Sequence, residues 1–73
     1  MPKLPHLSGA QIIRTLDILG FVRIRQSGSH VLLRRGSVGC VVLNHKEVKI
    51  GTLAGLLRQT GVSAEEFLSA LAS

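Results

Sequence analysis

The apolar pattern of this sequence changes from a helical period to a strand-like alternation directly after Gly20. Between residues 12 and 19 the apolar side chains recur at the spacing of one helix face, whereas residues 21–25 alternate and are rich in β-branched side chains. A glycine immediately after the last periodic residue is typical of a helix end. The change therefore predicts a helix over residues 9–19 that leads into a sheet.

The predicted sheet contains three short strands. After the first strand, Ser27-Gly28 has the composition of a turn. Residues 29–35 and 39–44 have the composition of two further strands, with the segment 36–39 (G-S-V-G) between them. Short connections between consecutive strands favour an antiparallel meander.

Capping signals mark the starts of two helices. Ser8 is followed by Gln11, and Ser63 by Glu66, at the spacing of a capping box, in which each side chain bonds to the backbone of the other residue. The first helix should therefore begin just after Ser8 and a third helix just after Ser63.

A second helix is expected to open at Ile50 and to close at Gly61, with a leucine stripe on one side that we assign to the core. The stripe consists of Leu53, Leu56 and Leu57, for which a partner-binding groove is the less favoured alternative. The resulting order, αβββαα, predicts the α+β class: a three-stranded antiparallel sheet with helices on one face and the other face free. This arrangement resembles the double-stranded-RNA-binding-domain topology, αβββα.

The length of the chain limits what its fold can enclose. Its 73 residues are expected to form one domain, 1–73, in which residues 1–7 are a lead-in. A domain of this size buries only about 60% of its unfolded surface, so a large enclosed active-site cavity is not expected.

The cellular setting is indicated by cysteine content and hydropathy. The single Cys40 excludes an internal disulfide and a multi-cysteine metal site, which fits a reducing compartment. No apolar run reaches the ~20 residues of a membrane span, and the N-terminus lacks the apolar segment of a signal peptide. We therefore expect a soluble cytoplasmic protein without a membrane partner.

Charge is distributed unevenly along the chain. Nine Lys and Arg against four Asp and Glu give a net charge of +5, which indicates a polyanionic partner. Residues 18–46 contain no carboxylate but carry Arg23, Arg25, Arg34, Arg35 and Lys46. Cations on a sheet release counterions from bound nucleic acid, so we interpret these residues as phosphate ligands. The alternative is that they are ordinary solvated strand charges.

Strand alternation predicts where these arginines point. It places Arg23 and Arg25 together on one side of the first strand. It places Arg34 and Arg35 on opposite faces of the second strand, and leaves open which of the two faces RNA.

Several kinds of chemistry are excluded by what the sequence lacks. Single-strand RNA readers stack bases on exposed aromatic side chains, whereas only Phe21 and Phe67 are present and both are expected in the core. Two-metal hydrolysis and paired-carboxylate catalysis need clustered acids, and Glu47 is the only carboxylate near the strands. No metal or other cofactor is therefore expected.

Histidine is the remaining candidate for catalysis. His30 lies directly after the first turn of the predicted sheet, and His45 follows the third strand. His6 lies in the lead-in, where we expect it to face solvent. A lone histidine is most often structural. His30 is distinguished by the surrounding cations, which favour a neutral imidazole, and by Gly28, which lets a ligand approach the backbone. A neutral imidazole can take the proton of an RNA 2′-OH, and nearby cations can stabilise the attack of that oxygen on the adjacent phosphate.

Three segments in this order resemble the HicA toxins, also called YcfA-like proteins, of bacterial type II toxin–antitoxin systems. They are Q-S-G-S-H at residues 26–30, V-L-N-H at residues 42–45 and K-I-G-T-L-A-G-L-L-R-Q-T-G at residues 49–61. The similarity extends from the first helix through residues 62–67. Gly-Ser-His alone is common by chance, whereas the order, the spacing, the length and the Gly-Thr-Leu helix are together specific.

The resemblance implies a ribosome-independent mRNA interferase, an endoribonuclease with a double-stranded-RNA-binding-like fold. The family's catalytic histidine corresponds to His30, with Gly28 and Ser29 shaping its turn. The resemblance also implies a HicB-like antitoxin that binds the toxin and covers its active site. RNA and this antitoxin are the expected partners, and operator DNA is expected to be contacted only through the antitoxin.

Two residues depart from the family pattern. Val31 stands where members often carry a second histidine, and Leu43 stands where they often carry a proline. The first change should leave His30 able to act. The second alters how His45 is presented, so His45 is an auxiliary candidate, for phosphate contact or acid catalysis, against a structural role.

Two other functions remain open from the residues alone. The chain could be a non-catalytic RNA-binding module in which His30 is a turn residue. It could also be a small oligomer-forming protein whose basic face docks to an acidic protein. Outside the strands, Lys49 and Arg58 are expected to be helix-surface charges rather than phosphate ligands.

Overall fold

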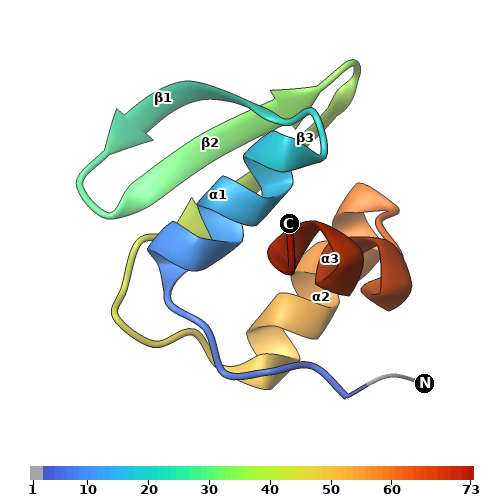
Figure 1. Ribbon diagram of the computed structural model, residues 1–73. Coiled ribbons are helices and arrows are strands. Elements are labelled where there is room, and N and C mark those ends of the chain that lie inside the picture. The colour runs from blue at the N-terminus through green and yellow to red at the C-terminus, as the bar shows by residue number, and fades with distance from the viewer. Residues whose placement is uncertain (1–2) are drawn as a thin grey trace.

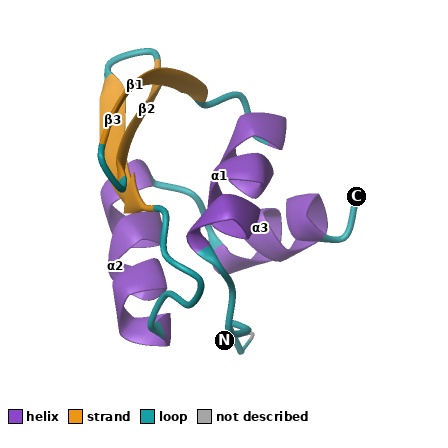
Figure 2. Ribbon diagram, turned by 90° about the vertical axis from the view of Figure 1, so that its left-hand side faces the viewer, coloured by secondary structure: helices purple, strands orange, loops and turns teal. Residues whose placement is uncertain are grey.

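The computed structural model describes residues 3–73 and has the predicted order of elements. These are α1 (Gly9–Ile18), β1 (Val22–Ser27), β2 (His30–Arg35), β3 (Val38–Leu43), α2 (Ile50–Thr60) and α3 (Ala64–Leu71). The strands form one antiparallel sheet in the order β1-β2-β3. The helices lie on one side of this sheet and leave its other face uncovered (Figure 1, Figure 2). The predicted α+β architecture, similar to a double-stranded-RNA-binding domain, is confirmed.

Both predicted capping boxes form. The Gln11 backbone N–H donates to Ser8 Oγ at 3.1 Å, and the Ser8 N–H donates to Gln11 Oε1 at 2.9 Å. The pair Ser63 and Glu66 repeats this exchange at 3.0 Å and 3.2 Å. Each box pairs N–H groups that the first turn of a helix leaves without a partner, which fixes where α1 and α3 begin.

The end of α1 lies one residue before the predicted boundary and is a complete Schellman turn. Leu19 is the C-cap and Gly20 adopts a φ of 97°. The Phe21 N–H donates to the Leu16 carbonyl at 2.9 Å, and the Gly20 N–H donates to the Asp17 carbonyl at 3.0 Å. The positive φ needs a glycine, because a Cβ would clash with the backbone. The turn places Phe21 in the core.

Two-residue Gly-Ser turns close both hairpins. Gly28 and Gly36 occupy the first turn position with φ of 58° and 61°. A positive φ there suits the twist of paired strands. Because each turn uses only two residues, β1 extends to Ser27 and β3 begins at Val38, which corrects the predicted strand limits by one or two residues.

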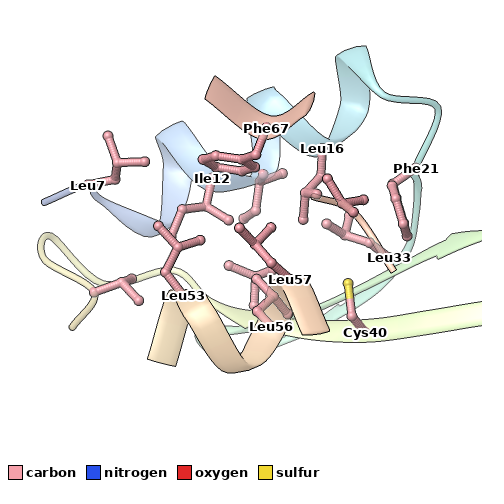
Figure 3. Packing of buried hydrophobic residues seen from close by; sticks show 14 of the residues in the cluster. Leu7, Ile12, Leu16, Phe21, Leu33, Cys40, Leu53, Leu56, Leu57 and Phe67 are labelled. Atoms are coloured by element: carbon pink, nitrogen blue, oxygen red, sulfur yellow. The ribbon is translucent and has the colours of Figure 1, made fainter. Parts of the chain in front are cut away.

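One apolar cluster fills the space between the sheet and the helices (Figure 3). The predicted leucine stripe of α2 is buried there, and Phe21 and Phe67 are fully buried, as expected. Alternate strand residues complete the cluster from the side of the sheet, namely Val31, Leu33, Cys40 and Val42. Burial raises the pKa of the Cys40 thiol. Cys40 is therefore a protonated core side chain rather than a reactive nucleophile.

Part of the predicted lead-in belongs to the core. Leu7 is buried and forms an isolated antiparallel bridge with Val48, whose N–H donates to the Leu7 carbonyl at 2.8 Å. This bridge ties the N-terminal segment to the loop before α2. His6, one residue earlier, is exposed as expected. Residues 1–2 of the lead-in lie outside the described part of the chain.

Candidate active site

The strand register assigns each side chain to one face of the sheet, because paired residues in antiparallel strands point to the same side. Val31 and Leu33 are buried against the helices, so the alternate residues of β2 point to the uncovered face. We call this face, with the partners of those residues in β1 and β3, the open face. It consists of Val22, Arg25, Ser27, His30, Leu32, Arg34, Gly39, Val41 and Leu43.

His30 is the first residue of β2 and lies at one end of the open face. It is paired with Ser27 in β1 and with Leu43 in β3, and its side chain is exposed. The next residue, Val31, is fully buried on the opposite face. A histidine at position 31 would thus point into the core of this fold. Of these two positions, only His30 can meet a ligand from solvent.

Hydrogen bonds hold the turn that carries His30. The Asn44 N–H donates to the Ser29 carbonyl at 2.7 Å, so the pairing of β2 with β3 continues to the turn. The Gln26 side-chain amide donates to the Gly28 carbonyl at 3.1 Å. A Cβ added to Gly28 would meet no atom within 4 Å. The turn is therefore fixed, and the space above Gly28 is open to a ligand.

The prediction that Arg23 and Arg25 lie on one side of β1 is wrong. Arg23 is paired with Leu33 and Arg25 with Leu32, because an irregularity at Ile24 interrupts the alternation. Arg25 therefore belongs to the open face, whereas Arg23 points to the side of the helices. Arg25 is also diagonal to His30 across the β1–β2 pair, a placement in which Cα atoms lie about 7–8 Å apart.

Arg34 and Arg35 point to opposite faces, as predicted, and Arg34 is the one on the open face. The guanidinium carbon of Arg35 lies 4.7 Å from the centre of the Phe21 ring. Arg35 Nη1 also donates to the carbonyl of Leu19, the C-cap of α1, at 2.9 Å. Arg35 thus packs against the end of α1, away from His30.

These contacts give Arg35 a measurable effect on stability. We expect Arg35→Ala to lower the free energy of unfolding by about 1 kcal/mol, because it removes a charged hydrogen bond and a cation–π contact at an exposed site. Arg34→Ala, the matched change one residue earlier, should alter it by less than about 0.5 kcal/mol. Urea unfolding followed by circular dichroism measures both values. An equal loss in the two variants would contradict the role assigned to Arg35.

His45 lies in the loop between β3 and α2, two residues after the β3 partner of His30. Its backbone is fixed, because the Gly9 N–H at the start of α1 donates to the His45 carbonyl at 2.8 Å. The two histidines are therefore at the same end of the sheet, and both side chains are exposed. Lys46 follows in the same loop and is also exposed.

The two other predicted cations belong to the second helix. Lys49 is the N-cap of α2 and Arg58 lies in its last turn, and both are exposed, as expected. Within residues 3–73, no three His, Cys, Asp or Glu side chains are grouped closely enough to hold a metal ion. Two hollows, of about 630 Å³ beside α2 and α3 and about 300 Å³ between β3 and α2, do not include His30.

Sequence reasoning missed Ser27 and Leu32 as neighbours of the candidate residues. Ser27 lies directly across the hairpin from His30, and Leu32 lies between His30 and Arg34 on the open face. The signal for Ser27 was present, because a two-residue turn at Gly28-Ser29 makes the flanking residues partners.

The fold and the site together define a class: a small basic α+β domain, similar to double-stranded-RNA-binding domains, with an exposed histidine on an uncovered cationic sheet face. Residues 9–62 match the family described as "HicA toxin of bacterial toxin-antitoxin". This range is more than half of the chain, which therefore belongs to the HicA toxin family. The family implies a toxin–antitoxin system with an antitoxin partner. No curated protein and no solved structure matches the chain.

The searched part of the chain, residues 3–73, contains no helix that is both long and apolar enough to span a bilayer.

Proposed function

We propose that this toxin is an endoribonuclease that cleaves mRNA without a metal ion and is restrained by a HicB-like antitoxin. The observation that carries the proposal is the position of His30, exposed on the open face with Arg25 diagonal to it. Membership of the HicA family supports the toxin function. The carboxylate-free strands support a polyanionic substrate.

In the proposed reaction, His30 acts as the general base. Its neutral imidazole takes the proton of a 2′-OH, and the freed oxygen attacks the adjacent phosphorus. Arg25 stabilises the negative charge that develops on the phosphoryl oxygens. The bond to the 5′ oxygen breaks, and this oxygen takes a proton, for which His45 is the candidate donor. The products are a 2′,3′-cyclic phosphate and a 5′-OH, with no water or metal consumed in the step.

The remaining open-face cation binds the substrate further along the strand. Arg34 is four residues from His30 on β2, or about 13 Å at the rise of an extended strand. A phosphate that flanks the cleaved one is therefore its natural ligand. At the other end, the open space above Gly28 lets the RNA backbone approach the Gly28-Ser29 turn, and Lys46 adds charge beside His45.

Cleavage of labelled RNA by the purified chain in EDTA tests the proposal. We expect fragments with 2′,3′-cyclic phosphate ends at a rate that EDTA does not change, and inhibition when the antitoxin is added. RNA that is bound but stays intact would instead support a non-catalytic RNA-binding module. Loss of cleavage in EDTA, or products with 3′-OH ends, would exclude the 2′-OH mechanism.

The arginines of β1 provide a matched pair for the electrostatic part of the proposal. Arg25→Ala should lower kcat/KM by about 10- to 100-fold, because it removes the cation diagonal to His30 on the open face. Arg23→Ala removes the same charge from the other side of β1, and screening should limit its effect to less than about fivefold. Single-turnover cleavage assays at one salt concentration measure both. Equal losses would show that only the net charge of β1 matters.

A further inference from the structure

The cations and the uncharged residues of the open face are divided between the strands. Arg25 and Arg34 belong to β1 and β2, whereas the open-face residues of β3 carry no charge. The latter are Gly39, Val41 and Leu43. A phosphate backbone is attracted to the cations of β1 and β2, which leaves β3 for the uncharged parts of the same ligand.

A hollow lies just beyond β3, within reach of a ligand bound at His30. α2 packs beside β3 (Figure 2), and a hollow of about 300 Å³ lies between them. Leu43 lines this hollow and is the direct cross-strand partner of His30. Adjacent strands lie about 4.8 Å apart, so the outer side of β3 is roughly 10 Å from the backbone of β2. One nucleotide spans this distance, so an RNA with a phosphate at His30 can place an adjoining base in the hollow.

The hollow combines aliphatic surface with hydrogen-bonding side chains. Val41 and Leu43 line it on the β3 side, and Val41 is 48% exposed. Thr52 and Gln59 line it on the α2 side and are exposed, so a hydroxyl and an amide that can both donate and accept are available there. These two residues are seven positions apart, or about 10 Å along the helix. Gly55 lies between them and leaves room because it has no side chain.

We propose that this hollow is a binding subsite for one unpaired base of the RNA, a base that adjoins the phosphate at His30. The proposal rests on the proposed function in taking RNA as the ligand. A base is flat and uncharged, and its edge carries donors and acceptors that match the lining. Val41 and Leu43 contact the ring, while the Gln59 amide pairs with the edge as glutamine pairs with adenine. The described residues that line the hollow include no aromatic side chain, so the base is read by its edge rather than by stacking.

The charge beside the hollow favours RNA as the occupant. The side chain nearest to the Gly55 position is that of Arg58, whose Nη2 would lie 3.7 Å from an added Cβ. A cation there attracts the phosphates on either side of a bound base. It repels a second copy of this chain, which carries a net charge of +5.

A base can enter the hollow only from RNA that is unpaired at that position. In a duplex the edge of each base is paired and its faces are stacked, so a base must leave the stack to enter a protein pocket. Arg25 and Arg34 also lie on one side of the open face, where they can hold a single backbone. The substrate is therefore single-stranded at the cleaved bond.

Binding of a short single-stranded RNA, with each base in turn replaced by an abasic ribose, tests the proposal. The His30→Ala chain keeps the RNA intact, and fluorescence anisotropy at one salt concentration measures Kd. We expect the loss of one particular base to weaken binding by about 5- to 10-fold. Adding Gln59→Ala should weaken binding of the unmodified RNA by the same factor and should have no further effect when that base is absent. Additive losses at every position would overturn the proposal.

Cleavage by the parent chain tests the proposed function separately. Coupling between Gln59 and one base, in the absence of any cleavage, would support the subsite and overturn the ribonuclease activity. Cleavage without such coupling would overturn the subsite alone.

Two glycines of α2 provide a matched pair that separates the subsite from effects on folding. Gly55→Gln fills the hollow with a side chain and also improves helix propensity, so it should weaken RNA binding by about 5- to 10-fold without weakening the fold. Gly51→Gln makes the same change where an added Cβ meets nothing within 4 Å, and it should leave the affinity unchanged. Equal RNA affinities of the two variants would overturn the proposal. So would a Gly55→Gln chain that loses affinity only for the antitoxin, because the hollow would then belong to the interface with that protein.

Discussion

Replacing His30 by alanine should reduce RNA cleavage by about 10²- to 10⁴-fold, which is the contribution of a well-placed general base. The imidazole is exposed at the end of β2, so its removal creates no cavity in the core. RNA binding should persist, because Arg25 and Arg34 are unchanged. Initial cleavage rates in EDTA and growth inhibition on expression provide the two readouts.

The control for this variant is His6→Ala, since His6 is also exposed but lies before the bridge between Leu7 and Val48. It should cleave RNA at the parent rate. Circular dichroism and the urea midpoint of His30→Ala should match those of the parent. If His30→Ala cleaves RNA in EDTA as fast as the parent, His30 is not the general base. The catalytic histidine of the family would then not correspond to His30 in this chain.

A methyl group on Gly9 should be far more damaging to the fold than the loss of His30. A Cβ there would collide with the Leu43 carbonyl oxygen and would lie 2.7 Å from Asn44 Cα and 3.0 Å from the His45 nitrogen. These are backbone atoms, which cannot turn aside as a flexible side chain can. We expect Gly9→Ala to lower the free energy of unfolding by about 2–4 kcal/mol, since it overpacks the contact and disturbs the Gly9–His45 hydrogen bond.

Such a loss is large for a domain of this length, whose whole stability should be roughly 4–11 kcal/mol. Gly51→Ala in the first turn of α2 is the matched control, because a Cβ there meets nothing within 4 Å. It should raise the free energy of unfolding by about 0.5–1 kcal/mol through helix propensity and reduced chain entropy. Urea unfolding of the two variants should therefore shift in opposite directions. A Gly9→Ala midpoint equal to that of the parent would contradict the close approach of α1 to the β3 end.

Features encoded by neighbouring residues could be predicted from the sequence. The capping boxes at Ser8 and Ser63 and the glycine stop at Gly20 depend on hydrogen bonds over a few residues, and each lies where the pattern placed it. The position of His30 just after a Gly-Ser turn could be read in the same way. These local signals were enough to give the order of elements and the uncovered face.

Features that depend on distant residues could not be predicted. Simple alternation along β1 gave no sign of the irregularity at Ile24, so it placed Arg23 beside Arg25. Nothing near Arg35 in sequence shows that its guanidinium packs on Phe21, and nothing near Leu7 points to its bridge with Val48. In each case the deciding partner is on another element, and only packing of the whole chain brings it near.

The order of strands in the sheet has a consequence for how the toxin must be controlled. Each strand pairs with its neighbour in sequence across a two-residue turn, so forming the sheet closes only short loops. Domains dominated by such local pairing fold fast, and we expect stopped-flow refolding to finish within about 0.1 s, in a single phase. A new chain would then be in its native form almost as soon as it leaves the ribosome. Protection of the host cell therefore cannot depend on slow maturation of the toxin, and the antitoxin has to be present when translation of the toxin ends.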